Sequence, residues 1–469
     1  MGGRSYEAVM ARKSEIVKAA VGIDYSKFEE AGGRFDYERM MREAVPHTLE
    51  EIVRIQGEMS VGNTKLLSLN NVTALARKTA GGGKGAQILV KDEAQNLSGS
   101  FKARRAALSV YEAHRMGYKG VVAATSGNYG AAVACMAARL GLKCIVVQEC
   151  YDSRRVGQPE ILEKQRACEA MGAEVVQLTV GPELFYETLM LLEDTGFYNA
   201  SLYTPSAIAG IETLGWEIAQ QCRSQLGRDP DVVVATNAGG GNITGTARGL
   251  RKAGAKSQVY AASVDLSGLH MASDHDFNRK SFTTGHTGFG VPFTVQPDRT
   301  DVPRNAARPL RYMDRYLLVK EGEVFYMTEA LAALEGMERG PAGNTSLAAA
   351  FALSMTLPSD QVIVVQETEY TGAGKHPMAQ LSFARRNGVE VLIGDPETEV
   401  PGKNIVLPDH PSRFKVREHS LEAMRRSALK RLAQDRKTAS AEDLEYFKAE
   451  LNADAEFVRK ELEALGVTC

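Results

Sequence analysis

Short apolar segments alternate strictly with helical segments through the middle of this chain. The pattern predicts strands at 120–124, 143–148, 174–179, 231–235, 258–264 and 361–366. The intervening segments repeat apolar residues at helical spacing, and several of them end at a glycine. Short apolar strands separated by helices are typical of parallel sheets that helices cover on both faces. The sequence therefore predicts an α/β fold built on parallel sheets.

The two ends of the chain have a different character from its middle. Residues 1–58 are charged and repeat apolar residues every three or four positions, which predicts a helical arm. Residues 401–469 become strongly charged and predict a C-terminal helical extension at the surface. The whole chain has 469 residues, more than one hydrophobic core usually serves, so two or more domains are expected.

Composition excludes several classes of partner. A formal charge of -2 gives no basis for binding nucleic acid or an anionic membrane, and no apolar run is long enough to cross a bilayer. The N-terminal residues lack the apolar core of a secretion signal. The six cysteines show neither CxxC nor paired spacing, and His270 and His286 have no metal-ligand spacing. We expect a cytoplasmic protein with reduced thiols and no metal.

Polar, glycine-containing loops follow three of the predicted strands. In parallel sheets ligands bind beyond the C-terminal ends of strands. The loop 125–130 (TSGNYG) opens a helix whose free N–H groups can hold a carboxylate, although the same pattern also suits an ordinary turn. The loop 237–245 (NAGGGNITG) lets backbone amides converge on a phosphate but lacks both nucleotide fingerprints. The loop 368–375 adds hydroxyls and glycines. Together they predict a phosphorylated cofactor that is not a nucleotide.

A single lysine stands between a glycine turn and a helix in the stretch 96–102 (NLSGSFK). Lys102 is placed at a helix N-terminus, where the helix dipole and partial burial both disfavour an ammonium group. A lysine with a lowered pKa is nucleophilic and can form a Schiff base with a carbonyl. A lone lysine in this position is more often simply solvated, and the three polar loops favour the reactive interpretation.

The motifs SGSFK, TSGNYG, GGGN and TGAGK, in this order, resemble those of the tryptophan synthase beta and threonine synthase superfamily. The similarity covers roughly residues 60–390 and implies a pyridoxal-phosphate enzyme of fold type II. It implies a two-domain, three-layer parallel-sheet fold. The large cofactor-binding domain would comprise 59–100 and 205–400, and the small domain 101–204.

The resemblance also assigns roles to individual residues. Lys102 would be the catalytic lysine that binds pyridoxal 5'-phosphate covalently, and Asn128 would bond the ring hydroxyl. The phosphate would be held by Gly239, Gly240, Gly241, Asn242 and Thr244. Thr371 would place a neutral hydroxyl at the pyridine nitrogen, and the substrate carboxylate would bind at Thr125, Ser126 and Gly127. Relatives read SFKDR where this chain has Ala103, so the substrate of threonine synthase is not carried over.

Further segments resemble the beta subunits of 2-amino-4-ketopentanoate thiolases over nearly the whole chain. These segments are YEAVMARK at 6–13, QECYDS at 148–153 and SFTTGHTGFG at 281–290. The similarity implies cleavage of a 2-amino-4-keto acid, 2-amino-4-oxopentanoate, with coenzyme A to acetyl-CoA and alanine during ornithine degradation. It also implies a small alpha subunit as partner, and we expect a beta–beta dimer. The segments 266–311 and 405–469 are candidate substrate or partner surfaces.

Three other functions remain open at this point. Another fold type II enzyme, such as threonine synthase or an amino-acid ammonia-lyase, would use the same lysine, but a phosphohomoserine substrate would need a second phosphate cradle that the sequence lacks. A non-catalytic cofactor-binding regulatory protein would not require Lys102. A nicotinamide dehydrogenase is disfavoured because the dinucleotide fingerprint is missing. No coenzyme A site is recognisable.

Overall fold

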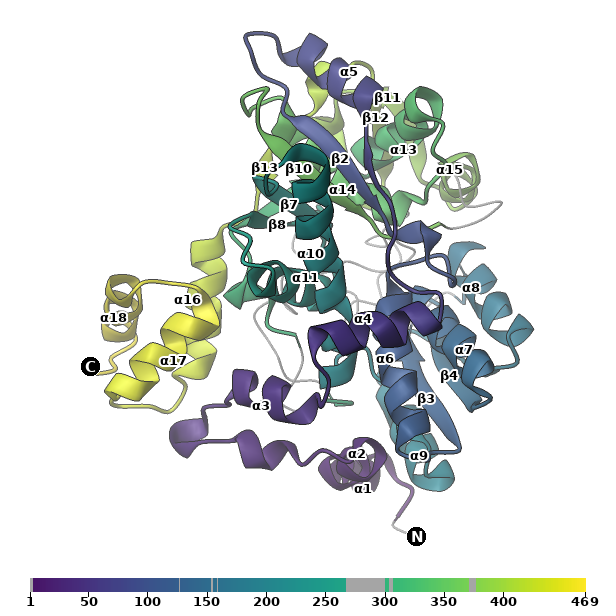
Figure 1. Ribbon diagram of the computed structural model, residues 1–469, viewed down its shortest axis with the longest axis vertical. Coiled ribbons are helices and arrows are strands. Elements are labelled where there is room, and N and C mark those ends of the chain that lie inside the picture. Colours follow the sequence, from purple (N-terminus) through teal and green to yellow (C-terminus); the bar gives the residue numbers. More distant parts are fainter. Residues whose placement is uncertain are drawn as a thin grey trace.

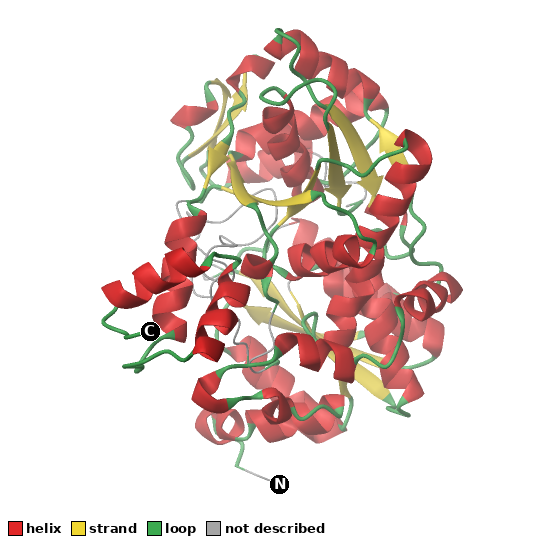
Figure 2. Cartoon of the chain, turned by 60° about the vertical axis from the view of Figure 1, so that its left-hand side comes forward, coloured by secondary structure: helices red, strands yellow, loops and turns green. Residues whose placement is uncertain are grey.

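Two sheets of mainly parallel strands form the body of the molecule, and helices surround the strands of both (Figures 1 and 2). The computed structural model describes residues 3–125, 127–152, 155–157, 159–266, 300–302, 307–370 and 377–469. The predicted α/β class is confirmed. Within the described residues, no helix combines the length and apolar character needed to cross a membrane.

The larger sheet has seven strands in the order β1-β2-β10-β7-β8-β9-β13. The edge strands β1 and β13 are antiparallel to their neighbours, and the other pairs are parallel. The strands are β1 Leu66–Ser68, β2 Gln87–Asp92, β7 Val232–Thr236, β8 Gln258–Val264, β9 Arg315–Val319, β10 Val362–Glu367 and β13 Arg417–Glu418. The central strands are buried on both faces, which explains why their sequences are continuous apolar runs.

The smaller sheet has four parallel strands in the order β5-β4-β3-β6. Its strands are β3 Gly120–Thr125, β4 Lys143–Tyr151, β5 Glu174–Thr179 and β6 Tyr198–Asn199. The helices α7 Asn128–Leu140, α8 Pro159–Ala170 and α9 Glu183–Thr195 connect them. All four strands fall inside the predicted small domain and the strands β1, β2 and β7–β10 inside the predicted large one, yet the domain division itself stays a prediction.

Three helices pack closely on one another, and the first two of them connect the two sheets along the chain. They are α6 Lys102–Arg115, α10 Pro205–Leu226 and α11 Gly241–Lys252. A methyl group added at Gly210 would collide with the backbone oxygen of Arg104 in α6, and one added at Gly215 would collide with the backbone of α11. Because α10 touches both neighbours through bare backbone, it fixes the start of α6 relative to the body of α11.

The remaining helices before residue 390 pack on the sheets or on other helices. They are α1 Tyr6–Ala11, α2 Lys13–Val21, α3 Tyr37–Ala44, α4 Leu49–Glu58, α5 Asn70–Ala80, α13 Glu321–Glu335, α14 Pro341–Ser354 and α15 Pro377–Arg386. The predicted arm is therefore helical, with α4 lying against α6 and α10. Helix α14 is apolar on nearly every side because it is enclosed by the large sheet and α13.

The C-terminal segment is not purely helical. It contributes strand β12 Asn404–Pro408, which pairs with β11 Glu390–Gly394 in a separate two-stranded sheet, and the edge strand β13. The helices α16 Leu421–Leu432, α17 Ala441–Leu451 and α18 Ala455–Ala464 follow it. Their buried residues Leu429, Phe447 and Val458 share one core cluster with the large sheet. The helical extension thus begins only at α16, and it packs onto the body (Figure 1).

Candidate active site

A cavity of about 370 Å³ lies where the C-terminal ends of strands from both sheets meet α6. Its walls come from the start of α6, from the loops after β3, β7 and β10, and from α8 and the start of α9. Of the predicted site residues, those in the lining are Lys102, Thr125, Gly127, Asn128, Gly239, Gly240, Gly241 and Asn242. Ser126 and Thr371 lie outside the described residues. The fold therefore brings the motifs of three distant segments to one place.

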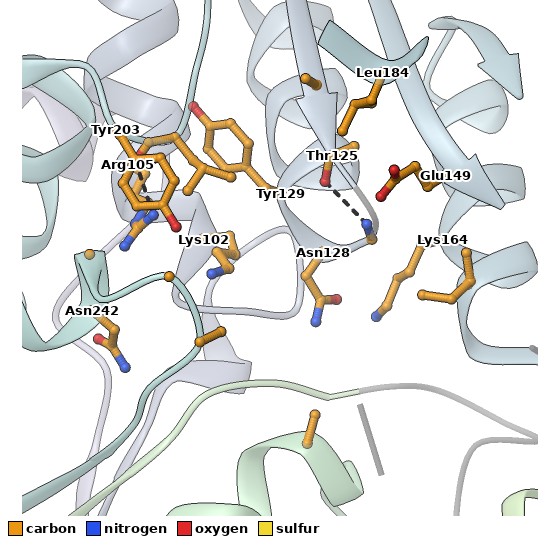
Figure 3. A pocket seen from close by; sticks show the side chains of 18 of the residues that line it. Lys102, Arg105, Thr125, Asn128, Tyr129, Glu149, Lys164, Leu184, Tyr203 and Asn242 are labelled. Carbon is orange, nitrogen blue, oxygen red and sulfur yellow. Dashed lines mark hydrogen bonds between the residues drawn. The ribbon is translucent and has the colours of Figure 1, made fainter. Parts of the chain in front are cut away.

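Lys102 is the first residue of α6, and its side chain enters the cavity (Figure 3). The turn before it is tied to the end of β10, since the Phe101 N–H donates to Thr368 O at 2.9 Å and the Tyr370 N–H to Gly99 O at 2.8 Å. Burial lowers the pKa of Lys102 well below its usual value; Arg105 lowers it further and Glu369 opposes the change. The neutral, nucleophilic amine is therefore favoured.

The loop after β3 is shaped by a threonine hydroxyl. The Oγ1 atom of Thr125 accepts hydrogen bonds from the Gly127 N–H at 3.1 Å and from the Gly130 N–H at 3.3 Å. Asn128 begins α7, and its amide points into the cavity beside Lys102 and Lys164 (Figure 3). The Thr125 hydroxyl thus organises the helix start, which leaves the Asn128 side chain available to a ligand.

Three successive glycines line the cavity between β7 and α11. A Cβ atom added at Gly239 would collide with the hydroxyl of Tyr203, and one at Gly241 with the guanidinium of Arg105. Gly240 has a φ of +85° and would meet the ring of Pro309. No larger residue fits this turn, so its backbone lies bare at the start of a helix, where N–H groups and the helix dipole favour an anion.

Two predicted phosphate residues support the glycine turn from behind. The Asn242 side chain donates to Thr236 O at 3.3 Å. The Thr244 hydroxyl donates to Gly240 O at 2.9 Å and accepts from the Arg308 N–H at 3.1 Å, and Thr244 is fully buried outside the lining. The Thr244 side chain therefore holds the turn in this structure, and its contact with the phosphate stays a prediction.

The motifs did not predict several residues of the lining. Arg105 lies one helical turn after Lys102, fully buried, with its guanidinium carbon 5.7 Å from the ring centres of both Phe101 and Tyr203. Its Nη1 donates to Leu202 O at 3.0 Å. The three-residue spacing from Lys102 was the available signal, because residues i and i+3 share a helix face. Glu160 and Lys164 also line the cavity, outside every motif. Glu149 lies within the segment 148–153, and Thr368 and Glu369 lie within the loop 368–375, but none of these three was predicted as a site residue.

The residues present suit pyridoxal phosphate. The cavity combines a lysine of lowered pKa, a glycine cradle that any Cβ would obstruct and a buried arginine beside that cradle. Within the described segments, the Thr236 hydroxyl and both carboxylate oxygens of Glu369 are buried without a hydrogen-bond partner. Such orphaned polar atoms indicate a polar ligand. The same segments contain no cluster of His, Cys, Asp or Glu able to hold a metal ion.

Comparison with known proteins agrees with this site. Residues 58–369 match the family model described as pyridoxal-phosphate dependent enzyme. The chain is 63% identical over 457 residues to the 2-amino-4-ketopentanoate thiolase beta subunit of Acetoanaerobium sticklandii, covering 97% of each chain. It is 60% identical over 466 residues to a beta subunit of the same name from an unknown prokaryotic organism, covering 99% of this chain and 98% of the relative.

Solved structures show the same fold at lower identity. A crystal structure of a pyridoxal 5'-phosphate-dependent aspartate racemase superposes with a TM-score of 0.54 at 19% identity, covering 69% of this chain and 97% of the racemase. The family model spans the strands of both sheets from β1 to β10, together with every described lining residue of the cavity. The chain belongs to the pyridoxal-phosphate-dependent enzyme family, with the fold of its type II members.

Proposed function

We propose that this chain is the catalytic beta subunit of a 2-amino-4-ketopentanoate thiolase. The observation that carries the proposal is identity of 60–63% to beta subunits of that name along almost the entire length of the chain. The reaction joins the acetyl group of 2-amino-4-oxopentanoate to the sulfur of coenzyme A. The bond between carbons 3 and 4 breaks, and carbon 3 takes a proton to become the methyl group of alanine.

The residues of the cavity divide this work among them. When bound, pyridoxal phosphate supplies an electron sink for negative charge on the carbons next to the substrate amine. Lys102 would attach it covalently and afterwards move a proton at the α-carbon of the substrate. The glycine turn and Arg105 would hold its phosphate, and Asn128 its ring hydroxyl. The backbone around Gly127 would bind the substrate carboxylate at the start of α7.

Partner and location complete the proposal. The names of the two close relatives designate one subunit of a complex, which supports a small alpha subunit as partner of this chain in the cytoplasm. Pairing of two copies of this chain stays an expectation. Coenzyme A and the 2-amino-4-keto acid are the proposed substrates.

The proposal predicts that the isolated chain binds the substrate to its cofactor but forms no products without the small alpha subunit. With 2-amino-4-oxopentanoate, the isolated chain should change the absorption of its cofactor, because the aldehyde-binding lysine, the anion cradle and Asn128 all belong to this chain. Acetyl-CoA and alanine should form in equal amounts only after coenzyme A and the small subunit are added. Chromatography of both products makes the measurement.

Two results would count against this function. Absence of any spectral change with this substrate, while other amino acids produce one, would favour a different fold type II enzyme. Phosphate release from phosphohomoserine would identify a threonine synthase. Acetyl-CoA formation by the chain alone would keep the thiolase assignment but would remove the need for a partner.

Replacing Arg105 by glutamine should weaken binding of pyridoxal phosphate roughly ten- to a hundredfold, because a charge-assisted bond to the phosphate is lost. Titration of the cofactor-free protein by absorbance gives the dissociation constant. Pyridoxal, which lacks the phosphate, should bind the variant and the parent equally. Arg115→Gln, at the exposed end of the same helix, is the matched control. An equal loss for both ligands would show that Arg105 acts on the ring or on folding instead.

A further inference from the structure

One buried carboxylate in the cavity wall has no partner. Glu369 is 1% exposed and lines the cavity, and neither Oε1 nor Oε2 has a hydrogen-bond partner within the part of the chain that the structure describes. Burying a carboxylate without a donor is unfavourable, so native proteins rarely leave one in that state. Because the orphaned oxygens belong to a residue of the ligand cavity, the missing donor is expected on the ligand.

The backbone fixes Glu369 beside the turn that carries Lys102. Glu369 forms an antiparallel bridge with Ser100, and the bonds from Phe101 and Tyr370 described above flank this bridge. Glu369 interacts electrostatically with Lys102, since its negative charge opposes the lowering of the Lys102 pKa. No hydrogen bond joins the two side chains among the described contacts. The carboxylate is thus held at a set position on the same wall, with room for a ligand between it and other polar groups.

A second buried glutamate at the end of β10, Glu367, differs from Glu369 in its position relative to the cavity. Glu367 lies two residues earlier, is fully buried and also has no hydrogen-bond partner among the described residues. Burial and the nearby Asp92 raise the pKa of Glu367 well above its usual value, which favours its neutral form. It does not belong to the cavity lining. Glu367 therefore provides a matched internal control for Glu369.

The polar atoms of the cofactor leave one position for Glu369. The phosphate belongs at the glycine turn and Arg105, the aldehyde at Lys102 and the ring hydroxyl at Asn128. The pyridine nitrogen then remains, and when it is protonated its strongest acceptor is a carboxylate. We propose that Glu369 accepts a hydrogen bond from the protonated pyridine nitrogen of pyridoxal phosphate, in place of the neutral hydroxyl expected at Thr371. The proposal rests on the cofactor part of the proposed function and does not depend on the thiolase substrate.

A carboxylate at this position has a chemical consequence. It keeps the ring nitrogen protonated, because a carboxylate that is itself buried stabilises the charged form strongly. A protonated ring withdraws electrons more strongly than a neutral one. The orphaned carboxylate and the electron demand of the proposed carbon–carbon cleavage are therefore explained by one contact.

The test observes the ring nitrogen directly, without substrate. The protein is loaded with pyridoxal phosphate labelled with ¹⁵N in the ring, and the nitrogen chemical shift is measured by NMR at neutral pH. The parent protein should show the shift of a protonated pyridine. Glu369→Gln should move the signal to the position of an unprotonated pyridine, because the amide carries no charge. Glu367→Gln and Thr371→Val should both leave the shift of the parent.

Three outcomes would overturn the proposal. An unprotonated ring nitrogen in the parent protein would overturn the proposal by itself. This measurement needs no variant, so it decides the question even if Glu369→Gln fails to fold. A protonated nitrogen in a folded, fully loaded Glu369→Gln protein removes Glu369 from the contact. A shift caused by Thr371→Val alone assigns the contact to the hydroxyl. None of these measurements requires turnover, so they are independent of whether the thiolase reaction is correct.

Discussion

Lys102→Ala should reduce turnover by about 10³-fold or more, since the variant loses both the covalent attachment of the cofactor and the group that moves the α-proton. The structure gives the reason: Lys102 enters the cavity at the start of α6, and burial lowers its pKa so that the amine form prevails. Steady-state assays of the complex measure the loss. The glycine turn is unchanged in the variant, so it should still retain cofactor through the phosphate.

Covalent labelling provides the control for this prediction. Borohydride reduction of the parent, followed by peptide mapping, should place the pyridoxyl label on Lys102 alone. Two other lysines test the specificity: Lys164 lines the same cavity, and Lys91 is fully buried with a pKa that burial lowers. Lys164→Ala should keep the label on Lys102. A label on Lys91 or Lys164 in the parent would contradict the assignment.

Arg104→Ala should lower the free energy of unfolding by about 3–5 kcal/mol, the cost typical of breaking a buried ion pair. Arg104 is fully buried and binds Glu93 at 2.7 Å and Glu217 at 2.8 Å. Without it, Lys91, which binds Glu217 at 2.7 Å, would be the remaining cation bonded to either carboxylate in the described network. Chemical denaturation of the cofactor-free protein measures the change.

The control is an exposed ion pair of similar length. Arg54 and Glu58 lie 2.6 Å apart with side chains 62% and 58% exposed, so Arg54→Ala should change stability by less than about 0.5 kcal/mol. Equal effects of the two substitutions would show that the buried network stabilises the fold no more than an exposed ion pair does.

The buried network also predicts sensitivity to acid. Burial would raise the pKa of Glu217, but the positive charges of Arg104 and Lys91 have the larger effect and hold that pKa at about 2. Its stabilising contribution is present above the ordinary value of 4.5 and is lost as pH falls towards 2.

The sheet strands were the part of the fold easiest to predict. Strands β5 and β8 match the predicted ranges 174–179 and 258–264 to the residue. Such strands are easy to recognise in a sequence, because burial on both faces requires a continuous run of apolar residues. Strand β6 was not predicted because two residues carry no periodicity, and β13 was not predicted because its pairing with β9 is a tertiary contact of a charged segment.

The site was predictable to the extent that it lies in short motifs. Lys102, Asn128 and the glycine turn each follow a local pattern of turn and helix start, and the fold assembles them in one cavity. Tyr203 lies outside every motif, and Glu369 lies in the predicted loop 368–375 without a role of its own there, because only the packing of distant segments shows that both line the cavity. Local sequence could not reveal which way the Thr244 side chain faces, since its hydroxyl also accepts a hydrogen bond from the N–H of Arg308, 64 residues further along the chain.

The bare backbone of α10 has a practical meaning for redesign of this enzyme. At Gly210 and Gly215 there is no side chain to trim or enlarge, so backbone contact sets the distances from α10 to α6 and to α11. The opposite wall of the cavity, formed by α8 and the start of α9, consists of ordinary side chains such as Ile161 and Leu184. The substrate range can therefore be changed by substitutions on that wall. The contacts among α6, α10 and α11 hold the geometry of the site and should not be varied in a mutant library.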